Sequence, residues 1–102
     1  MAGVVTIPVG HPLVGTWVDG DRDYGSGVEF TIRAASTGFA VGAVDSDGEV
    51  LVISNVRWDG RTLSFDSFVP SNGHRVTYAL ELISPSEVSL RYSVTERWVR
   101  KP

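Results

Sequence analysis

The chain has 102 residues, a formal net charge of −3 and no cysteine. This is the length of one domain. The missing thiols exclude disulfides and thiolate metal sites, and the sequence has no lysine- or arginine-rich block to neutralise nucleic-acid phosphates. We therefore expect a single domain over residues 1–102, with no metal site, no cofactor and no nucleic-acid partner.

Residues 1–12 carry no sign of a targeting segment. They have neither the charged start nor the long apolar run of a signal peptide. No stretch of the chain approaches the roughly 18 apolar residues of a membrane helix. We expect a cytoplasmic protein without a membrane partner, in which residues 1–12 are loose or cover the domain.

The rest of the chain alternates apolar and polar residues with a period of two, which predicts β-strands. In the first half we expect strands at residues 13–19, 26–34, 39–44 and 49–58. Val28, Phe30 and Ile32 share one face of the second of these strands. The sequence Asp45-Ser46-Asp47-Gly48 predicts a tight turn, because Asp and Gly tolerate the positive φ that such turns require.

Three further strands are expected in the second half, at residues 61–69, between the turns at 70–73 and 84–86, and from about residue 87 onward. The last two strands show the clearest alternation, with an inward set of Val76, Tyr78, Leu80 and Leu82 followed by Val88, Leu90, Tyr92 and Val94. An eighth strand is expected either at Val4–Ile7 or at Arg97–Lys101.

Short connections throughout predict that strands adjacent in the sequence pair as antiparallel hairpins. We therefore predict an all-β fold, an antiparallel up-and-down meander of seven or eight strands that closes into a small barrel. Closure is expected because a twisted sheet of this size curls, and because a barrel has no exposed edges.

Two short motifs lie at the ends of this meander. The first predicted strand contains Gly15-Thr16-Trp17, and the end of the chain carries Arg97, Trp98 and Arg100. This pair of motifs resembles the lipocalin-like (calycin) group of up-and-down barrels. The resemblance implies that Trp17 closes one end of a barrel and that an arginine packs across its ring. Arg100 shares strand phase with Trp98 and is the favoured partner, with Arg97 as the alternative.

The resemblance also implies a non-enzymatic protein that binds a small apolar or amphipathic ligand. Seven aromatic side chains are the candidate ligand-binding residues: Trp17, Phe30, Phe39, Trp58, Phe65, Tyr78 and Tyr92. Apolar walls with a few polar groups are typical of such sites, and the hydroxyls of Tyr78 and Tyr92 would mark a polar end. Alternatively these rings fill the core, which the small size of the domain favours.

A second hypothesis is a protein-interaction module or homodimer that uses the outward face of strands four to six. That face would gather Phe68 and Ile83 with one pair from the fourth strand, either Val50 and Val52 or Leu51 and Ile53. Apolar patches of this kind often mark protein contacts. The alternative is a cover for the patch, formed by a bulge near Ser54 and Asn55 or by Val4, Val5 and Ile7.

No catalytic residues are predicted, and a small barrel enzyme is the last-ranked hypothesis. Asp19, Asp21 and Asp23 begin like a calcium loop, but Tyr24 and Phe30 stand where that loop requires Gly and a bidentate Glu. The only two histidines, His11 and His74, are too few for a zinc site without cysteines. Gly25-Ser26-Gly27 lacks the pattern of a nucleophile elbow.

Overall fold

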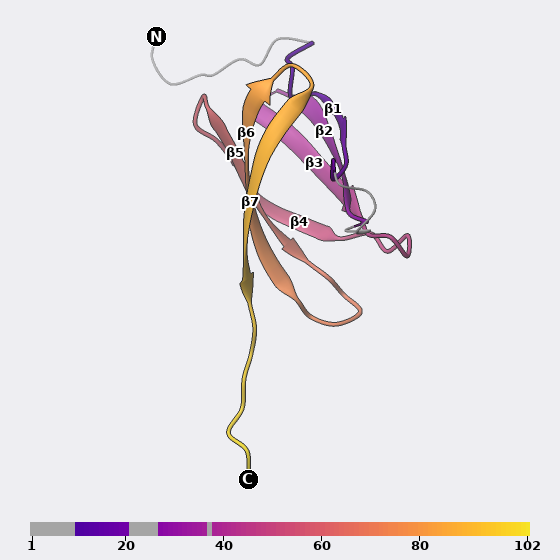
Figure 1. Cartoon of the computed structure of the whole chain (residues 1–102), viewed down its shortest axis with the longest axis vertical. Coiled ribbons are helices and arrows are strands. Elements are labelled where there is room, and N and C mark those ends of the chain that lie inside the picture. Colours follow the sequence, from indigo (N-terminus) through magenta and orange to yellow (C-terminus); the bar gives the residue numbers. More distant parts are fainter. Residues whose placement is uncertain (1–9, 21–26, 37) are drawn as a thin grey trace.

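The computed structural model describes residues 10–20, 27–36 and 38–102, and within them the fold is all-β (Figure 1). These residues form the strands β1 (Gly15–Trp17), β2 (Glu29–Ala35), β3 (Gly38–Val44), β4 (Val52–Trp58), β5 (Thr62–Phe68), β6 (Arg75–Ser84) and β7 (Glu87–Thr95). They make two antiparallel sheets with the orders β1-β2-β3 and β4-β5-β6-β7. The predicted antiparallel meander, in which strands adjacent in the chain pair with each other, is confirmed.

Two of the turns between strands are fixed by aspartate side chains that accept hydrogen bonds from backbone N–H groups. The Asp45 Oδ1 accepts hydrogen bonds from the backbone N–H groups of Asp47 and Glu49, both at 2.9 Å. The Asp59 Oδ1 accepts from the N–H groups of Arg61 and Thr62, at 2.8 and 2.6 Å. Such aspartates stabilise turns because their short side chains satisfy backbone donors that no strand partner reaches.

A β-bulge in β4 decides which of its residues face inward. The register with β5 shifts between Ser54 and Arg57, and Asn55 adopts a left-handed φ of 56°. The predicted bulge near Ser54 and Asn55 is therefore confirmed. One extra residue in β4 lets Trp58 still face inward opposite Leu63.

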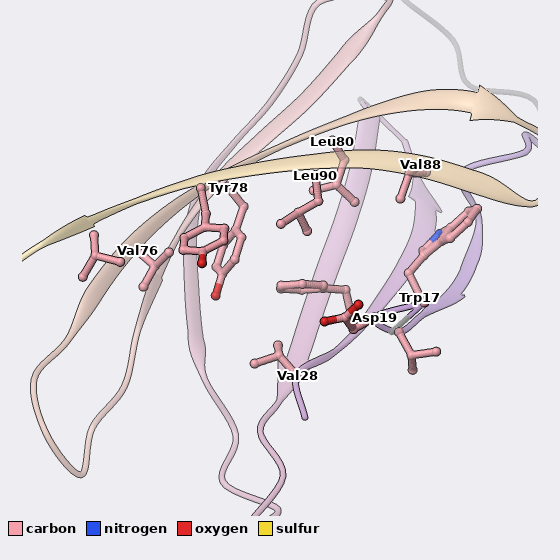
Figure 2. Close-up of a pocket in the computed structure, with 13 residues that line it drawn as sticks. Trp17, Asp19, Val28, Val76, Tyr78, Leu80, Val88 and Leu90 are labelled. Carbon is pink, nitrogen blue, oxygen red and sulfur yellow. The ribbon is translucent and has the colours of Figure 1, made fainter. Parts of the chain in front are cut away.

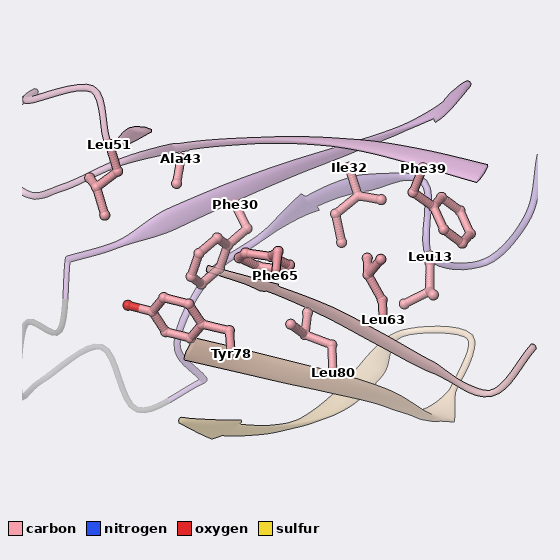
Figure 3. Close-up of a cluster of buried hydrophobic side chains, with 10 residues drawn as sticks. All are labelled: Leu13, Phe30, Ile32, Phe39, Ala43, Leu51, Leu63, Phe65, Tyr78 and Leu80. Atoms are coloured by element: carbon pink, nitrogen blue, oxygen red, sulfur yellow. The ribbon is translucent and has the colours of Figure 1, made fainter. Parts of the chain in front are cut away.

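The core lies between the two sheets (Figure 3). Phe30 of β2 packs edge-to-face on Phe65 of β5 and on Tyr78 of β6, with ring centroids 5.4 and 4.9 Å apart. Leu63 and Leu80 are fully buried beside them. Burying side chains of this size stabilises the fold by about 1.5–3 kcal/mol each, which makes this cluster the main link between the sheets.

The sheets are joined along one side only. Leu51 N–H donates to the Ala43 carbonyl at 3.0 Å, and Val44 and Val50 form an isolated antiparallel bridge, so β3 leads into β4 almost continuously. On the other side β1 pairs with β2 and β7 pairs with β6, and these two strands form no ladder with each other within the described residues. The three residues of β1 are too few to cover the nine residues of β7.

The last residues depart most from the sequence-based expectation. Residues 96–102, which we name the C-terminal arm, form no strand and run away from both sheets (Figure 1). Arg97 and Arg100 are exposed, so the expected packing of either arginine across Trp17 is not formed. The expected eighth strand at Arg97–Lys101 is wrong, because none of the described strands lies beside the arm to pair with it. The alternative strand at Val4–Ile7 falls outside the described residues.

Across the described parts of the chain, no helix is present that is both long and apolar enough to span a membrane.

Candidate functional site

An apolar groove of about 560 Å³ opens between the two sheets on the side where β1 and β7 do not meet (Figure 2). One wall is the inner face of β6 and β7. The other wall comes from β1, the residues directly after it, and the start of β2. The main lining residues are Val76, Tyr78, Leu80, Val88, Leu90, Tyr92 and Val94 on the first wall, and Trp17, Val18, Asp19, Val28 and Phe30 on the second.

The first wall is built by the register of β6 and β7. Leu80 lies directly opposite Leu90, and Tyr78 lies directly opposite Tyr92. Because residues opposite each other in an antiparallel pair share one face, the alternating apolar residues of both strands point into the groove. The inward set predicted for these strands therefore forms a continuous apolar surface.

A few polar groups break the apolar lining. The rings of Tyr78 and Tyr92 lie side by side with centroids 6.2 Å apart, and Asp19 stands on the opposite wall (Figure 2). The Tyr78 phenol can donate a hydrogen bond, because it is protonated at neutral pH, and burial raises its pKa further above the ordinary value of 10.0. The indole N–H of Trp17 is already used, because it donates to the Leu13 carbonyl at 2.9 Å.

The groove is open to solvent along β7. Leu90 is 38% exposed and Tyr92 is 65% exposed, although both face inward. The described strands therefore do not close into a barrel. The opposite sheet ends at the short strand β1, so no described strand covers the inner face of β7 at Leu90 and Tyr92.

The structure distributes the seven predicted ligand-binding residues over three places. Trp17, Phe30, Tyr78 and Tyr92 line the groove. Phe65 is fully buried within the core.

Phe39 and Trp58 lie apart from the groove, in an aromatic cluster with His11. The ring of His11 meets Phe39 and Trp58 edge-on at centroid distances of 5.2 and 5.6 Å, and the other two rings are 5.0 Å apart. The His11 Nδ1 accepts a hydrogen bond from the Leu13 N–H at 3.1 Å. These contacts give His11 a structural role at the start of the described chain.

Several lining residues were predicted to face inward without being assigned to a site. They are the aliphatic residues Val28, Val76, Leu80, Val88, Leu90 and Val94. Alternation alone predicts their direction. Identifying them as groove residues requires knowing that β7 has no partner on its far side, a property that no residue pattern within β7 records.

The remaining polar candidates make ordinary turn contacts or lie outside the described residues. His74 donates its backbone N–H to the Asn72 Oδ1 at 2.9 Å, as expected of a turn residue. Within the described ranges, no three His, Asp or Glu side chains gather in a way that could hold a metal ion. Asp21, Asp23 and Ser26 lie outside those ranges.

The expected patch on the outward face of strands four to six is divided. Leu51 and Ile53 turn inward, which leaves Val50 and Val52 exposed at one end of the sheet. Next to Val52 lies Phe68, whose ring carries the Arg75 guanidinium at 5.0 Å. Ile83 lies two residues beyond Glu81, which pairs with Thr62 at the opposite end of β5. Ile83 therefore does not join the patch.

The groove offers the chemistry of a binding site. Its described lining supplies one carboxylate and two phenols among aliphatic and aromatic walls. No family model matches the chain, and neither a curated protein nor a solved structure is significantly similar to it. What the groove can hold therefore follows from its own geometry and chemistry.

Proposed function

We propose that this protein binds a small apolar or amphipathic molecule in the groove between its two sheets. One observation carries the proposal, namely the open groove of about 560 Å³ lined by inward residues of β6 and β7. Pockets of about 300–1,000 Å³ with mostly apolar walls and a few polar groups are typical of small-molecule sites. The role is that of a carrier or sensor rather than an enzyme.

The polar groups in the groove favour one kind of ligand. The hydroxyl of Tyr78 can donate a hydrogen bond to an alcohol or carbonyl oxygen on the ligand. We therefore favour a ligand that carries a hydrogen-bond acceptor in its head group on an apolar body.

We further propose that the meander is an open relative of the lipocalin-like barrel. The sequential antiparallel strand order and the position of Trp17 in the groove wall support this relation. The position of Arg97 and Arg100 away from Trp17 counts against it. Closure of the barrel would need a further element between β1 and β7.

A displacement assay tests ligand binding. An uncharged fluorescent dye, Nile red, is bound first and then competed with dodecanol or dodecane, which have the same chain length and differ only in the hydroxyl group. We expect saturable displacement by dodecanol and weaker displacement by dodecane, because only dodecanol can accept a hydrogen bond from Tyr78.

Two tryptophan substitutions localise the site. Leu90→Trp places a large ring in the groove, and we expect it to weaken binding of dodecanol about tenfold or more, equivalent to at least 1.4 kcal/mol. Val52→Trp adds the same ring on the outward face of β4 and serves as the control. Equal affinities in both variants, or no saturable binding to the unmodified protein, would contradict the proposal.

A further inference from the structure

β7 is an unprotected sheet edge. It spans nine residues and pairs on one side with β6, while its other side faces no strand among the described residues. Soluble proteins usually defend such edges with short strands, proline, charged side chains or bulges. β7 carries the charged residues Glu87 and Arg91 but is long and has no proline, and its inward residues Leu90, Tyr92 and Val94 are uncharged and 38–65% exposed.

The C-terminal arm extends this edge and is itself apolar in part. Trp98 is 86% exposed and Val99 is 72% exposed. The Trp98 indole N–H donates to the Glu96 Oε2 at 3.1 Å, so these alternate side chains lie on the same side of the arm. The alternation of β7 thus continues into residues 96–102.

The arm cannot easily fold back onto its own groove. Between Glu96 and Lys101 the sequence contains no Gly, Asn, Asp or Pro, the residues that reverse the chain in tight turns. A straight continuation of β7 is therefore favoured. Together β7 and the arm cover 87–102, which corresponds to about 50 Å of extended chain.

We propose that β7 pairs antiparallel with β7 of a second copy of this chain. The two four-stranded sheets would then form one continuous sheet of eight strands around a two-fold axis. A two-fold contact brings the same surface of both copies together, so it must be self-complementary. This inference goes beyond ligand binding and does not depend on it.

The charge pattern of the strand supplies that complementarity. The start of β7 is acidic at Glu87, and the arm is basic overall, with Arg97, Arg100 and Lys101 against the single acid Glu96. An antiparallel arrangement brings the acidic start of one copy next to the basic end of the other. A parallel arrangement would place like charges together, which destabilises strand pairs.

The same charges select one register. Placing Glu87 opposite Arg97 of the second copy puts Tyr92, the residue midway between them, on the two-fold axis. Moving this axis one residue toward the N-terminus would set Arg91 opposite Arg91 of the second copy. Moving it two residues toward the C-terminus would set Arg91 opposite Arg97, so both of these registers oppose like charges. An axis at Ser93 opposes no like charges, but it sets Glu87 opposite the uncharged Val99 and so gains no charge pair.

This register also covers the exposed apolar residues. Tyr92 meets its own copy, and Leu90 lies opposite Val94, both on the inward face. Stable interfaces bury about 800 Å² on each partner. Tyr92, which is 65% exposed, contributes on the order of 100 Å² to this area, since a buried aromatic side chain accounts for 150–250 Å².

Light scattering on the full chain tests the pairing first. We expect a mass of twice 11.0 kDa that falls toward 11.0 kDa on dilution. A monomer at every concentration would show that the edge is covered within one chain and would overturn the proposal.

Single-cysteine variants then test the register, because the natural chain contains no cysteine. We expect Tyr92→Cys to form a disulfide-linked dimer under mild oxidation, since opposed strand residues lie within disulfide range. Val52→Cys, which is similarly exposed on the outward face of β4, is the control and should stay largely unlinked. The reverse result would assign the contact to the outward face instead.

Charge reversal provides an independent readout in the absence of oxidation. We expect Arg97→Glu to raise the dimer dissociation constant about tenfold, because two opposite-charge pairs become like-charge pairs. The double variant Glu87→Arg with Arg97→Glu should restore the original constant. Both residues are exposed, so circular dichroism should show an unchanged fold. Failure of the double variant to restore dimerisation would refute this register, whatever the result of the ligand assay.

Discussion

Two rows of side chains cross the four-stranded sheet from its covered part to its open edge, and their burial differs sharply along the way. Leu63, Leu80 and Leu90 lie in register on β5, β6 and β7 and are 0%, 0% and 38% exposed. Phe65, Tyr78 and Tyr92 form the next row, with exposures of 0%, 9% and 65%. Residues of similar type, on the same face, thus have very different environments.

The difference teaches that facing inward and being buried are separate properties. β5 and β6 lie under Phe30, whose ring contacts both Phe65 and Tyr78. β7 lies beyond the end of the opposite sheet. The covered residues hold the domain together, while the uncovered ones provide the groove and the edge that we assign to binding.

The largest expected effect comes from truncating the two ends of the aromatic row. Phe65→Ala should lower the free energy of unfolding by about 3–5 kcal/mol, since it leaves a cavity in the packed core. Tyr92→Ala should lower it by less than about 1 kcal/mol, as for a surface side chain. Urea unfolding at low protein concentration measures both, and equal losses would contradict the comparison.

Gly27 and Gly48 also differ in how crowded their surroundings are. Both have positive φ, +68° at Gly27 and +81° at Gly48, but an added Cβ at Gly27 would lie 2.4 Å from the Ser46 Cβ whereas Gly48 has open space. We expect Gly27→Ala to cost about 3 kcal/mol, from backbone strain plus overpacking. Gly48→Ala should cost about 1 kcal/mol from strain alone. Thermal unfolding that ranks the two equally would show that Ser46 moves aside.

Removing the buried hydroxyl of Ser67, in β5, should have a smaller effect of opposite sign on the free energy of unfolding. The Ser67 hydroxyl is buried and has no partner with hydrogen-bond geometry among the described residues, although it lies near enough to the Tyr78 phenol to lower the pKa of that group against the effect of burial. Leaving such a group unsatisfied costs about 1–3 kcal/mol, so Ser67→Ala should raise the free energy of unfolding by about 1 kcal/mol. Ser64→Ala, on the outward face of the same strand, is the matched control. A loss of stability in Ser67→Ala would reveal a partner for this hydroxyl.

The smallest effect is a pH dependence at the boundary between the covered and open parts. Burial raises the pKa of Tyr78 above the ordinary value of 10.0, so the folded protein holds this proton more tightly than the unfolded chain does. This contribution to stability is complete below pH 10 and is lost as the pH rises from there through the folded pKa. Urea unfolding across this pH range should show that the free energy of unfolding falls as the pH rises. The fall should be less steep in Tyr78→Phe. An identical slope in both proteins would place Tyr78 in water.

Much of the fold could be predicted because it depends on local rules. Alternation with period two predicted the inward face of β6, and Asp45 marked a turn that its side chain does stabilise. The inward direction of Tyr78 and Tyr92, on neighbouring strands, was also predicted and holds.

The candidate site was harder to predict. Four of the seven aromatic candidates line the groove, and the other three pack elsewhere, because aromatic type alone does not distinguish a core ring from a groove ring.

By itself, the sequence determined most of the strands, their antiparallel order and the inward faces of β6 and β7, since these follow from neighbours along the chain. Only the tertiary structure decided that β1 ends before it can cover β7, that the sheets stay open on that side, and that Leu90 and Tyr92 border a groove. Depth of burial depends on what lies across the interior, and that contact joins residues far apart in the sequence.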